Sequence, residues 1–65
     1  MTITINGGMR DVGSATVADL LRELELTERL VAVEVNREVV RRAAFQTCAL
    51  HEGDVLEIVS FVGGG

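Results

Sequence analysis

The stretch Asp54-Val55-Leu56-Glu57-Ile58-Val59-Ser60 is apolar enough to form a central strand of a sheet, and it leads directly into Phe61-Val62-Gly63-Gly64-Gly65. Within it, Leu56 and Ile58 are predicted to face a helix. Three consecutive glycines make the slimmest and most pliant backbone available to a protein. At 3.3 to 3.6 Å per extended residue, this tail carries its terminal carboxylate roughly 17 Å beyond the sheet. The sequence therefore predicts that the Gly65 carboxylate is the reactive group.

The beginning of the chain predicts a β-hairpin. Residues 2–5 alternate polar and apolar side chains, which is the period of a half-buried strand. Asn6-Gly7 follows, and both residues tolerate the positive φ of a tight hairpin turn. Residues 9–12 are predicted to return as the second strand, with Met9 or Val12 facing inward, and Gly13-Ser14-Ala15 ends it.

One amphipathic helix is predicted next. Thr16 is a suitable N-cap, and Asp19 places a negative charge in the first turn. An apolar stripe of helical spacing follows: Val17, Leu20, Leu21 and Leu24. Arg22, Glu23 and Glu25 are predicted to face water, and residues 26–29 to connect the helix to the next strand. A helix with one apolar face is expected to lie on a sheet.

The middle of the chain predicts two more strands. Residues 30–35 alternate, and their inward positions are Val31, Val33 and Val35. A tight turn at 36–37, a short strand at 38–41 and a helical turn at 42–46 follow, with Phe45 covering one end of the core. Leu50 is predicted to be buried in the next crossing, and residues 52–54 to form a turn.

This order of elements predicts an α+β fold of the β-grasp (ubiquitin-like) type, a mixed sheet of about five strands with one main helix packed across it. The first and last strands are expected to lie side by side and parallel at the centre, because the helix supplies the crossover that parallel strands require. We expect residues 1–60 to form a single β-grasp domain and residues 61–65 to form a flexible tail.

Composition excludes several classes of function. The 65 residues carry ten acidic side chains, six arginines and no lysine, for a net charge of −4, which disfavours nucleic acid as a partner. An apolar run of about 20 residues, which a membrane span needs, does not occur. The single cysteine, Cys48, cannot form an internal disulfide, and the N-terminus lacks a secretory signal pattern. We therefore expect a cytoplasmic location.

The chain resembles the ubiquitin-like sulfur carriers, and within them the ThiS family, along its whole length. The segments that carry the resemblance are 3–7 (ITING), 16–21 (TVADLL), 31–36 (VAVEVN), 38–40 (EVV) with Arg42 and Phe45, 53–54 (GD), 57–59 (EIV) and 62–65 (VGGG). Three positions depart from the family pattern. Arg37 stands where a turn glycine is usual, Arg41 where proline is frequent, and Phe45 where tryptophan is frequent.

The resemblance implies a chemistry for the tail. A ThiF-type adenylating enzyme would use ATP to form the acyl-adenylate of Gly65, a cysteine desulfurase-derived persulfide would supply sulfur, and a ThiG-type thiazole synthase would take it from the resulting thiocarboxylate. The chain has no phosphate-binding Gly-x-x-x-x-Gly-Lys loop, so ATP is expected on the partner and no cofactor on this chain. The chain would then be a carrier and not an enzyme.

Several residues are candidates for the site. Gly63, Gly64 and Gly65 are expected to enter a partner's active site, which would exclude any Cβ sterically. The candidates for docking on the partner are Val59, Phe61, Val62 and Arg42. Phe61 has an equally supported alternative, in which it closes the core.

Two further side chains favour plain interpretations. Cys48 is expected to be an idle or buried thiol, because no second cysteine accompanies it. His51 is expected to be solvated, and no metal site is predicted, because no second ligand stands at a suitable spacing.

Three alternatives to the thiamine pathway stay open at this point. A MoaD-like carrier for molybdopterin would use the same chemistry but is usually longer. A ubiquitin-like protein modifier would join Gly65 to lysines of target proteins. A β-grasp binding module with an inert tail would be unaffected by deletion of the last two glycines.

Overall fold

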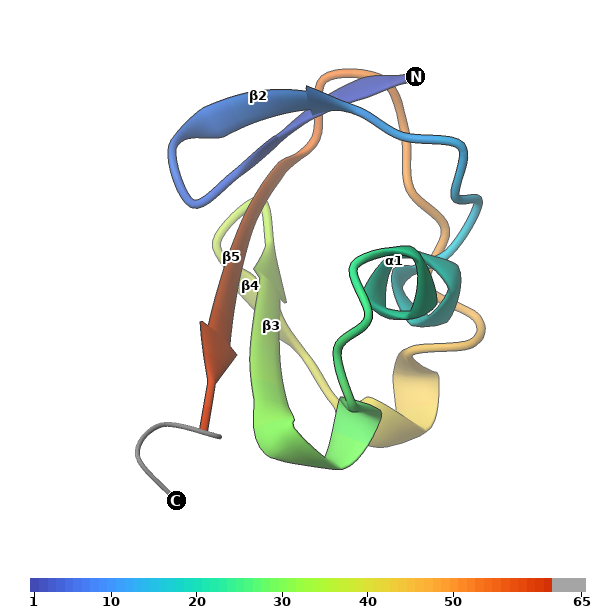
Figure 1. Ribbon diagram of the computed structural model, residues 1–65, viewed down its shortest axis with the longest axis vertical. Helices are drawn as coiled ribbons and strands as arrows, with labels where there is room; N and C mark the ends of the chain where they lie inside the picture. The colour runs from blue at the N-terminus through green and yellow to red at the C-terminus, as the bar shows by residue number, and fades with distance from the viewer. Residues whose placement is uncertain (62–65) are drawn as a thin grey trace.

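A mixed five-stranded sheet is the framework of the chain in the computed structural model, which describes residues 1–61 (Figure 1). Its strands are β1 (Thr2–Ile5), β2 (Gly8–Asp11), β3 (Val31–Val35), β4 (Glu38–Val40) and β5 (Val55–Ser60). They lie in the order β2-β1-β5-β3-β4. β1 and β5 are parallel, and the other neighbouring pairs are antiparallel. The predicted parallel pairing of the first and last strands is confirmed.

The helix α1 (Val17–Glu23) packs on one face of this sheet. The Thr16 hydroxyl accepts a hydrogen bond from the Asp19 N–H at 3.1 Å, as expected of an N-cap. Two further N–H groups of the first turn, those of Val17 and Ala18, donate to carbonyls of the loop that precedes β5, at 3.0 and 2.9 Å. The loop thereby satisfies donors that a helix start leaves without partners within the helix.

The C-terminal end of α1 is closed by a left-handed residue that is not glycine. Glu25 has a φ of +60°, and its N–H donates to the Arg22 carbonyl at 3.1 Å. The Leu26 N–H reaches back to the Leu21 carbonyl at 2.8 Å. These two bonds form a Schellman motif. Glycine is usual at the left-handed position of this motif, here occupied by Glu25, because it has no Cβ.

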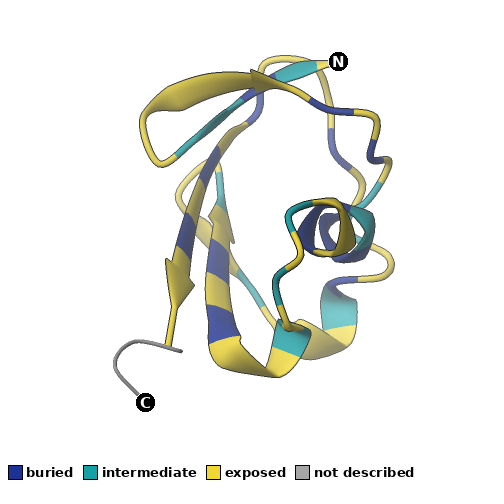
Figure 2. Ribbon diagram, in the orientation of Figure 1, coloured by how far each residue is buried: buried dark blue, intermediate teal, exposed yellow. Residues whose placement is uncertain are grey.

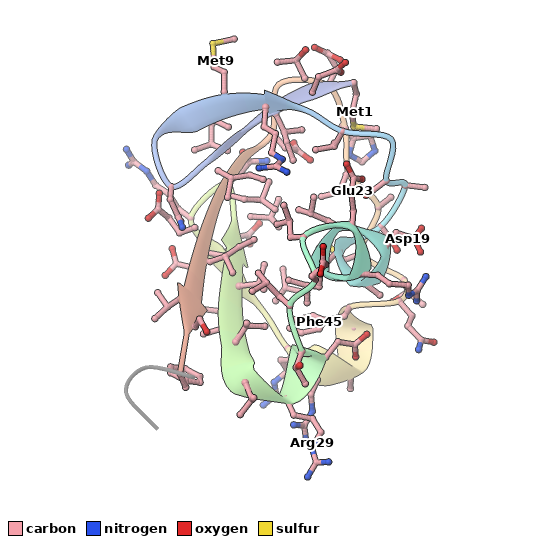
Figure 3. All side chains as sticks on the ribbon, in the orientation of Figure 1. Met1, Met9, Asp19, Glu23, Arg29 and Phe45 are labelled. Carbon is pink, nitrogen blue, oxygen red and sulfur yellow. The ribbon has the colours of Figure 1, made fainter. Side chains whose placement is uncertain are left out.

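The core lies between α1 and the inner face of the sheet, where buried positions alternate along β3 and β5 (Figure 2). Its buried apolar members are Ile3, Val12, Val17, Ala18, Leu20, Leu21, Val31, Val33, Phe45, Leu50, Leu56 and Ile58. The predictions for Leu56, Ile58, Phe45 and Leu50 are confirmed. Figure 3 shows Phe45 within the body of the molecule.

Of the two candidates for the inward position of the second strand, Val12 is buried, as predicted, whereas Met9 is 80% exposed and projects away from the sheet (Figure 3). Met9 is on the outermost strand, β2, opposite Thr4 of β1. Opposite residues share one face of the sheet, and the buried Ile3 next to Thr4 points to the other face, so Met9 faces outward. Strand boundaries shift by about one residue, because the 3₁₀ turn η1 (Glu28–Leu30) precedes β3 and the 3₁₀ turn η2 (Arg42–Ala44) follows β4. Val35 is half-buried and packs against the core, in agreement with its predicted inward position.

Both predicted hairpin turns have positive φ at their two central residues. Asn6 and Gly7 have φ values of +50° and +85°, and Asn36 and Arg37 have +52° and +72°. Consecutive left-handed residues of this kind match the twist of the strands that they join. Within residues 1–61, the chain contains no helix with the length and apolar character needed to cross a bilayer.

Candidate functional site

The strand that leads to the tail occupies the centre of the sheet. β5 is hydrogen-bonded to β1 on one side and to β3 on the other. The pairing with β3 continues to the end of the strand, where Val31 lies opposite Ser60. One residue further, the Phe61 N–H donates to the Leu30 carbonyl at 2.7 Å. The backbone is therefore held in place up to the first residue of the tail.

Asn6, in the first hairpin turn, extends the pairing of β1 with β5. Its backbone N–H donates to the Leu56 carbonyl at 2.9 Å. Its side-chain Oδ1 accepts from the Ile58 N–H at 2.8 Å, and its Nδ2 donates to the Ile58 carbonyl at 3.0 Å. The side-chain amide thus bonds to Ile58 as a neighbouring strand would.

Asn36, in the second hairpin turn, makes similar bonds at the start of β5. Its backbone N–H donates to the Val55 carbonyl at 2.7 Å, and its Oδ1 accepts from the Val55 N–H at 3.0 Å. The turns at the two sides of β5 therefore bond to this strand through matching asparagines. The sequence predicted both turns, but it gave no sign that their side chains reach the tail-bearing strand.

Asp54 connects this second turn to the preceding loop. Its carboxylate is buried, with 9% exposure of the residue, and accepts from Asn36 Nδ2 at 3.0 Å and from the His51 N–H at 2.8 Å. The His51 ring is exposed, as predicted, and its Nδ1 lies 3.8 Å from the same carboxylate. Among residues 1–61, no cluster of three or more His, Cys, Asp or Glu side chains could hold a metal ion.

Two of the predicted docking residues lie on the outer face of the sheet, away from α1. Val59 is 56% exposed and Phe61 is 63% exposed. The alternative that Phe61 closes the core is therefore wrong, because this residue is mostly exposed one position beyond β5, whereas the buried positions of that strand are Leu56 and Ile58. Leu30, which sequence reasoning did not single out, is 40% exposed beside Phe61.

Arg42, the third docking candidate within the described residues, is exposed at the start of η2. It lines two shallow surface hollows, and Arg29 of η1 lines both of them as well. Leu30 lines one of these hollows, so the two arginines border the residue that receives the Phe61 hydrogen bond. Sequence reasoning missed Arg29, because thirteen positions separate it from Arg42 and only the fold brings the two turns together.

The other predicted site residues, Val62, Gly63, Gly64 and Gly65, lie outside the described residues, so their roles stay predictions. Cys48 is a half-buried thiol packed against the core, and its idle role stays a prediction.

The fold and the exit of its central strand toward a glycine-rich end define a β-grasp domain of the ubiquitin-like class. The sequence profile of the ThiS family matches residues 3–65, which is nearly the entire chain. The chain belongs to the ThiS family.

Individual relatives agree with this assignment. The sulfur carrier protein ThiS of Bacillus subtilis is 41% identical over 56 residues, which cover 86% of this chain and 82% of that protein. The crystal structure of the thiamine biosynthesis protein ThiS from Geobacter metallireducens superimposes with a TM-score of 0.82, at 38% identity and with full coverage of both chains. A thiazole synthase of Paramagnetospirillum magneticum is 47% identical over 66 residues. That match covers the whole of this chain, which spans only 20% of the synthase's length.

Proposed function

We propose that this protein is a sulfur carrier for thiamine thiazole biosynthesis and that the Gly65 carboxylate carries the sulfur as a thiocarboxylate. The observation that carries the proposal is the ThiS family match, which extends through the glycines to residue 65. Its similarity to the Bacillus subtilis sulfur carrier supports the same role. The backbone hydrogen bonds that pair β5 with β3 continue to Phe61, and a carrier would need such a fixed strand at the start of its tail.

A carboxylate is a poor electrophile, so the sulfur transfer needs an activated form of Gly65. Attack of the carboxylate on ATP would give the acyl-adenylate and release pyrophosphate. The terminal sulfur of a persulfide would then attack the acyl carbon, and AMP would leave. A thiol would cleave the resulting S–S bond, becoming oxidised to a disulfide, and the thiocarboxylate would remain on Gly65. The sulfur atom is then the stronger nucleophile of the two atoms in that group.

The proposal assigns catalysis to partner proteins. A ThiF-type enzyme would bind ATP and adenylate the tail, a cysteine desulfurase would supply the persulfide, and a ThiG-type thiazole synthase would consume the sulfur in the cytoplasm. The similarity to part of two thiazole synthases, from Paramagnetospirillum magneticum and Magnetococcus marinus, supports the last partner. The carrier itself would bind no cofactor and return to the carboxylate after each transfer.

The test is the intact mass of the purified chain after incubation with ATP, cysteine, a desulfurase, a thiol and the adenylating enzyme from the same cells. We expect a gain equal to the replacement of one oxygen by sulfur, located at Gly65 by fragmentation. Attachment of the chain to lysines of other proteins would instead support the modifier alternative. An unchanged mass, with the enzyme active on another carrier, would refute the proposal.

A pair of glycine variants tests the steric part of the proposal. Gly64→Ala places a methyl group where the partner's cleft is expected to admit only bare backbone, so loading should fall at least roughly tenfold. Gly13→Ala is the matched control, because a Cβ at Gly13 meets nothing within 4 Å and its φ is not positive. Loading of Gly64→Ala at the rate of Gly13→Ala would contradict the narrow cleft.

A further inference from the structure

The outer face of β3 and β5 carries a ladder of side chains that ends at the tail. The register places Ala32 opposite Val59 and Glu34 opposite Glu57, and the Phe61 N–H bonds to the Leu30 carbonyl one step further. All of these residues are exposed. We call the four apolar members, Leu30, Ala32, Val59 and Phe61, the tail-root surface. Exposed apolar groups that gather in one place are typical of a protein-binding site.

An acidic pair borders the tail-root surface on the side away from the tail. Glu34 and Glu57 are directly opposite each other on neighbouring strands, where Cβ atoms are about 5 Å apart and like charges destabilise the sheet. Their side chains have no hydrogen bond or ion pair within residues 1–61. The isolated protein therefore retains a repulsion that a cation placed between the two carboxylates would relieve.

An arginine pair borders the tail-root surface on the opposite side. Arg29 and Arg42 line the same two hollows, and one hollow also includes Leu30. Figure 3 shows Arg29 projecting from the end of the molecule that carries η1, away from the core. Within the described part of the chain, neither guanidinium has an ion pair, although the chain as a whole has an excess of acidic groups. Glu28 lines one of these hollows, but within residues 1–61 it forms no ion pair with either arginine, so both guanidinium groups stand unpaired beside the exit of the tail.

We propose that the tail-root surface docks on the thiazole synthase, on an apolar area that has a basic group facing Glu34 and Glu57 and an acidic group facing Arg29 and Arg42. The inference rests on the proposed function and adds the chemistry of the partner's surface to it. The opposite signs at the two borders give the surface a direction. A carrier rotated by half a turn would place like charges together, which is a strong penalty against the wrong orientation. The charges therefore favour one orientation of the carrier on its partner, and this orientation sets the direction in which the tail enters.

The synthase is the chosen occupant because charge and sequence agree on it. The surface needs a partner with both signs of charge, which neither the uniformly negative backbone of a nucleic acid nor an anionic lipid surface supplies. A segment similar to all 65 residues of this chain is part of a thiazole synthase in two relatives. In these relatives the carrier-like segment and the rest of the synthase share one polypeptide, which favours the synthase as the occupant.

The test is calorimetric titration of the purified carrier into the thiazole synthase of the same organism, at two salt concentrations. One double variant, Glu34→Gln with Glu57→Gln, removes the acidic pair, and another, Arg29→Gln with Arg42→Gln, removes the arginine pair. Each has a control with the same charge change elsewhere on the exposed surface, Glu25→Gln with Glu38→Gln and Arg10→Gln with Arg37→Gln. Circular dichroism checks that every variant folds.

We expect each test variant to bind roughly tenfold more weakly than its control and to show less dependence on salt. The Glu34/Glu57 variant should also melt at a higher temperature than the wild type, because the repulsion is gone. Higher stability together with weaker binding is not expected if Glu34 and Glu57 serve only the fold. Equal affinities of test and control variants would overturn the inference.

Two further outcomes separate this inference from the proposed function. A wild-type carrier that gains sulfur at Gly65 but does not bind the synthase would overturn the docking inference and leave the carrier function intact. Self-association of the carrier that both test variants abolish, without binding to the synthase, would assign the surface to a second copy of the chain and overturn the inference as well. A carrier that never gains sulfur would refute the proposed function, whatever the titration shows.

Discussion

The side-chain amide of Asn6 bonds to both backbone groups of Ile58, with Oδ1 2.8 Å from the amide nitrogen and Nδ2 3.0 Å from the carbonyl oxygen. The turn of the first hairpin thereby fastens the strand that leads to the tail. Because Ile58 is buried in the core, the two bonds hold the backbone of a core residue three positions before Phe61.

Removal of the Asn6 side chain should destabilise the fold. Asn6→Ala loses two hydrogen bonds of about 1 kcal/mol each and puts alanine, which tolerates left-handed backbone less well than asparagine, at a φ of +50°, so we expect a loss of about 2 to 4 kcal/mol. Asn6→Gly loses the same bonds without the backbone strain and should lose less. Urea denaturation measures both. Equal losses would show that the left-handed backbone costs nothing here.

In the two hairpin turns, introducing a glycine and removing one should have opposite effects on stability. Arg37 has a φ of +72° in the position that Gly7 occupies in the first turn. Arg37→Gly should therefore stabilise the protein by about 1 kcal/mol, and Gly7→Ala should destabilise it by about the same amount. Thermal melting of the two variants checks this. A lower melting temperature for Arg37→Gly would mean that the arginine side chain contributes more than its backbone strain removes.

The helix end predicts a second stabilising glycine. Glu25 closes the Schellman motif at a φ of +60°, so Glu25→Gly should raise the free energy of unfolding by about 0.5 to 1 kcal/mol. Glu25→Ala is the control, because it removes the same charge and keeps a Cβ. Chemical denaturation of both variants separates the two contributions, and equal stabilities would contradict the backbone explanation.

The two phenylalanines should respond to substitution in opposite ways. Phe61 is 63% exposed and Phe45 is 1% exposed. Phe61→Asp should change the free energy of unfolding by less than about 0.5 kcal/mol and weaken partner binding, because its ring lies on the tail-root surface. Phe45→Ala should cost about 3 to 5 kcal/mol. Denaturation and binding assays on the same samples check this, and a large stability loss in Phe61→Asp would return that side chain to the core.

The sequence predicted the fold well where periodicity and turn chemistry agree. The alternation in residues 30–35 and 54–60, the N-cap at Thr16 and the two Asn turns all indicate local structure that the packing preserves. Prediction was less successful at Phe61, because an apolar residue after a strand fits both a core and a surface. The structure decides between these two interpretations, because Phe61 is exposed whereas Ile58 is buried in the core.

The surroundings of the tail root were beyond the reach of the sequence alone. Arg29 and Arg42 belong to separate 3₁₀ turns, and Glu34 meets Glu57 only through the register of β3 with β5. Such contacts depend on long-range pairing, which leaves no periodic pattern in either segment. The ThiS resemblance indicated that the tail is the reactive segment, but it did not indicate how these charges are arranged around it.

The parallel pairing of β1 with β5 has a practical consequence for experiments. Because the two strands run in the same direction, the chain enters the sheet at the end opposite to the one where Phe61 leaves it, as the position of the N label in Figure 1 shows. The Met1 amino group is held at that far end by the Val12 carbonyl at 3.0 Å. A linker joined ahead of Met1 could therefore immobilise the protein on a sensor chip with every tail root facing the flowing solution.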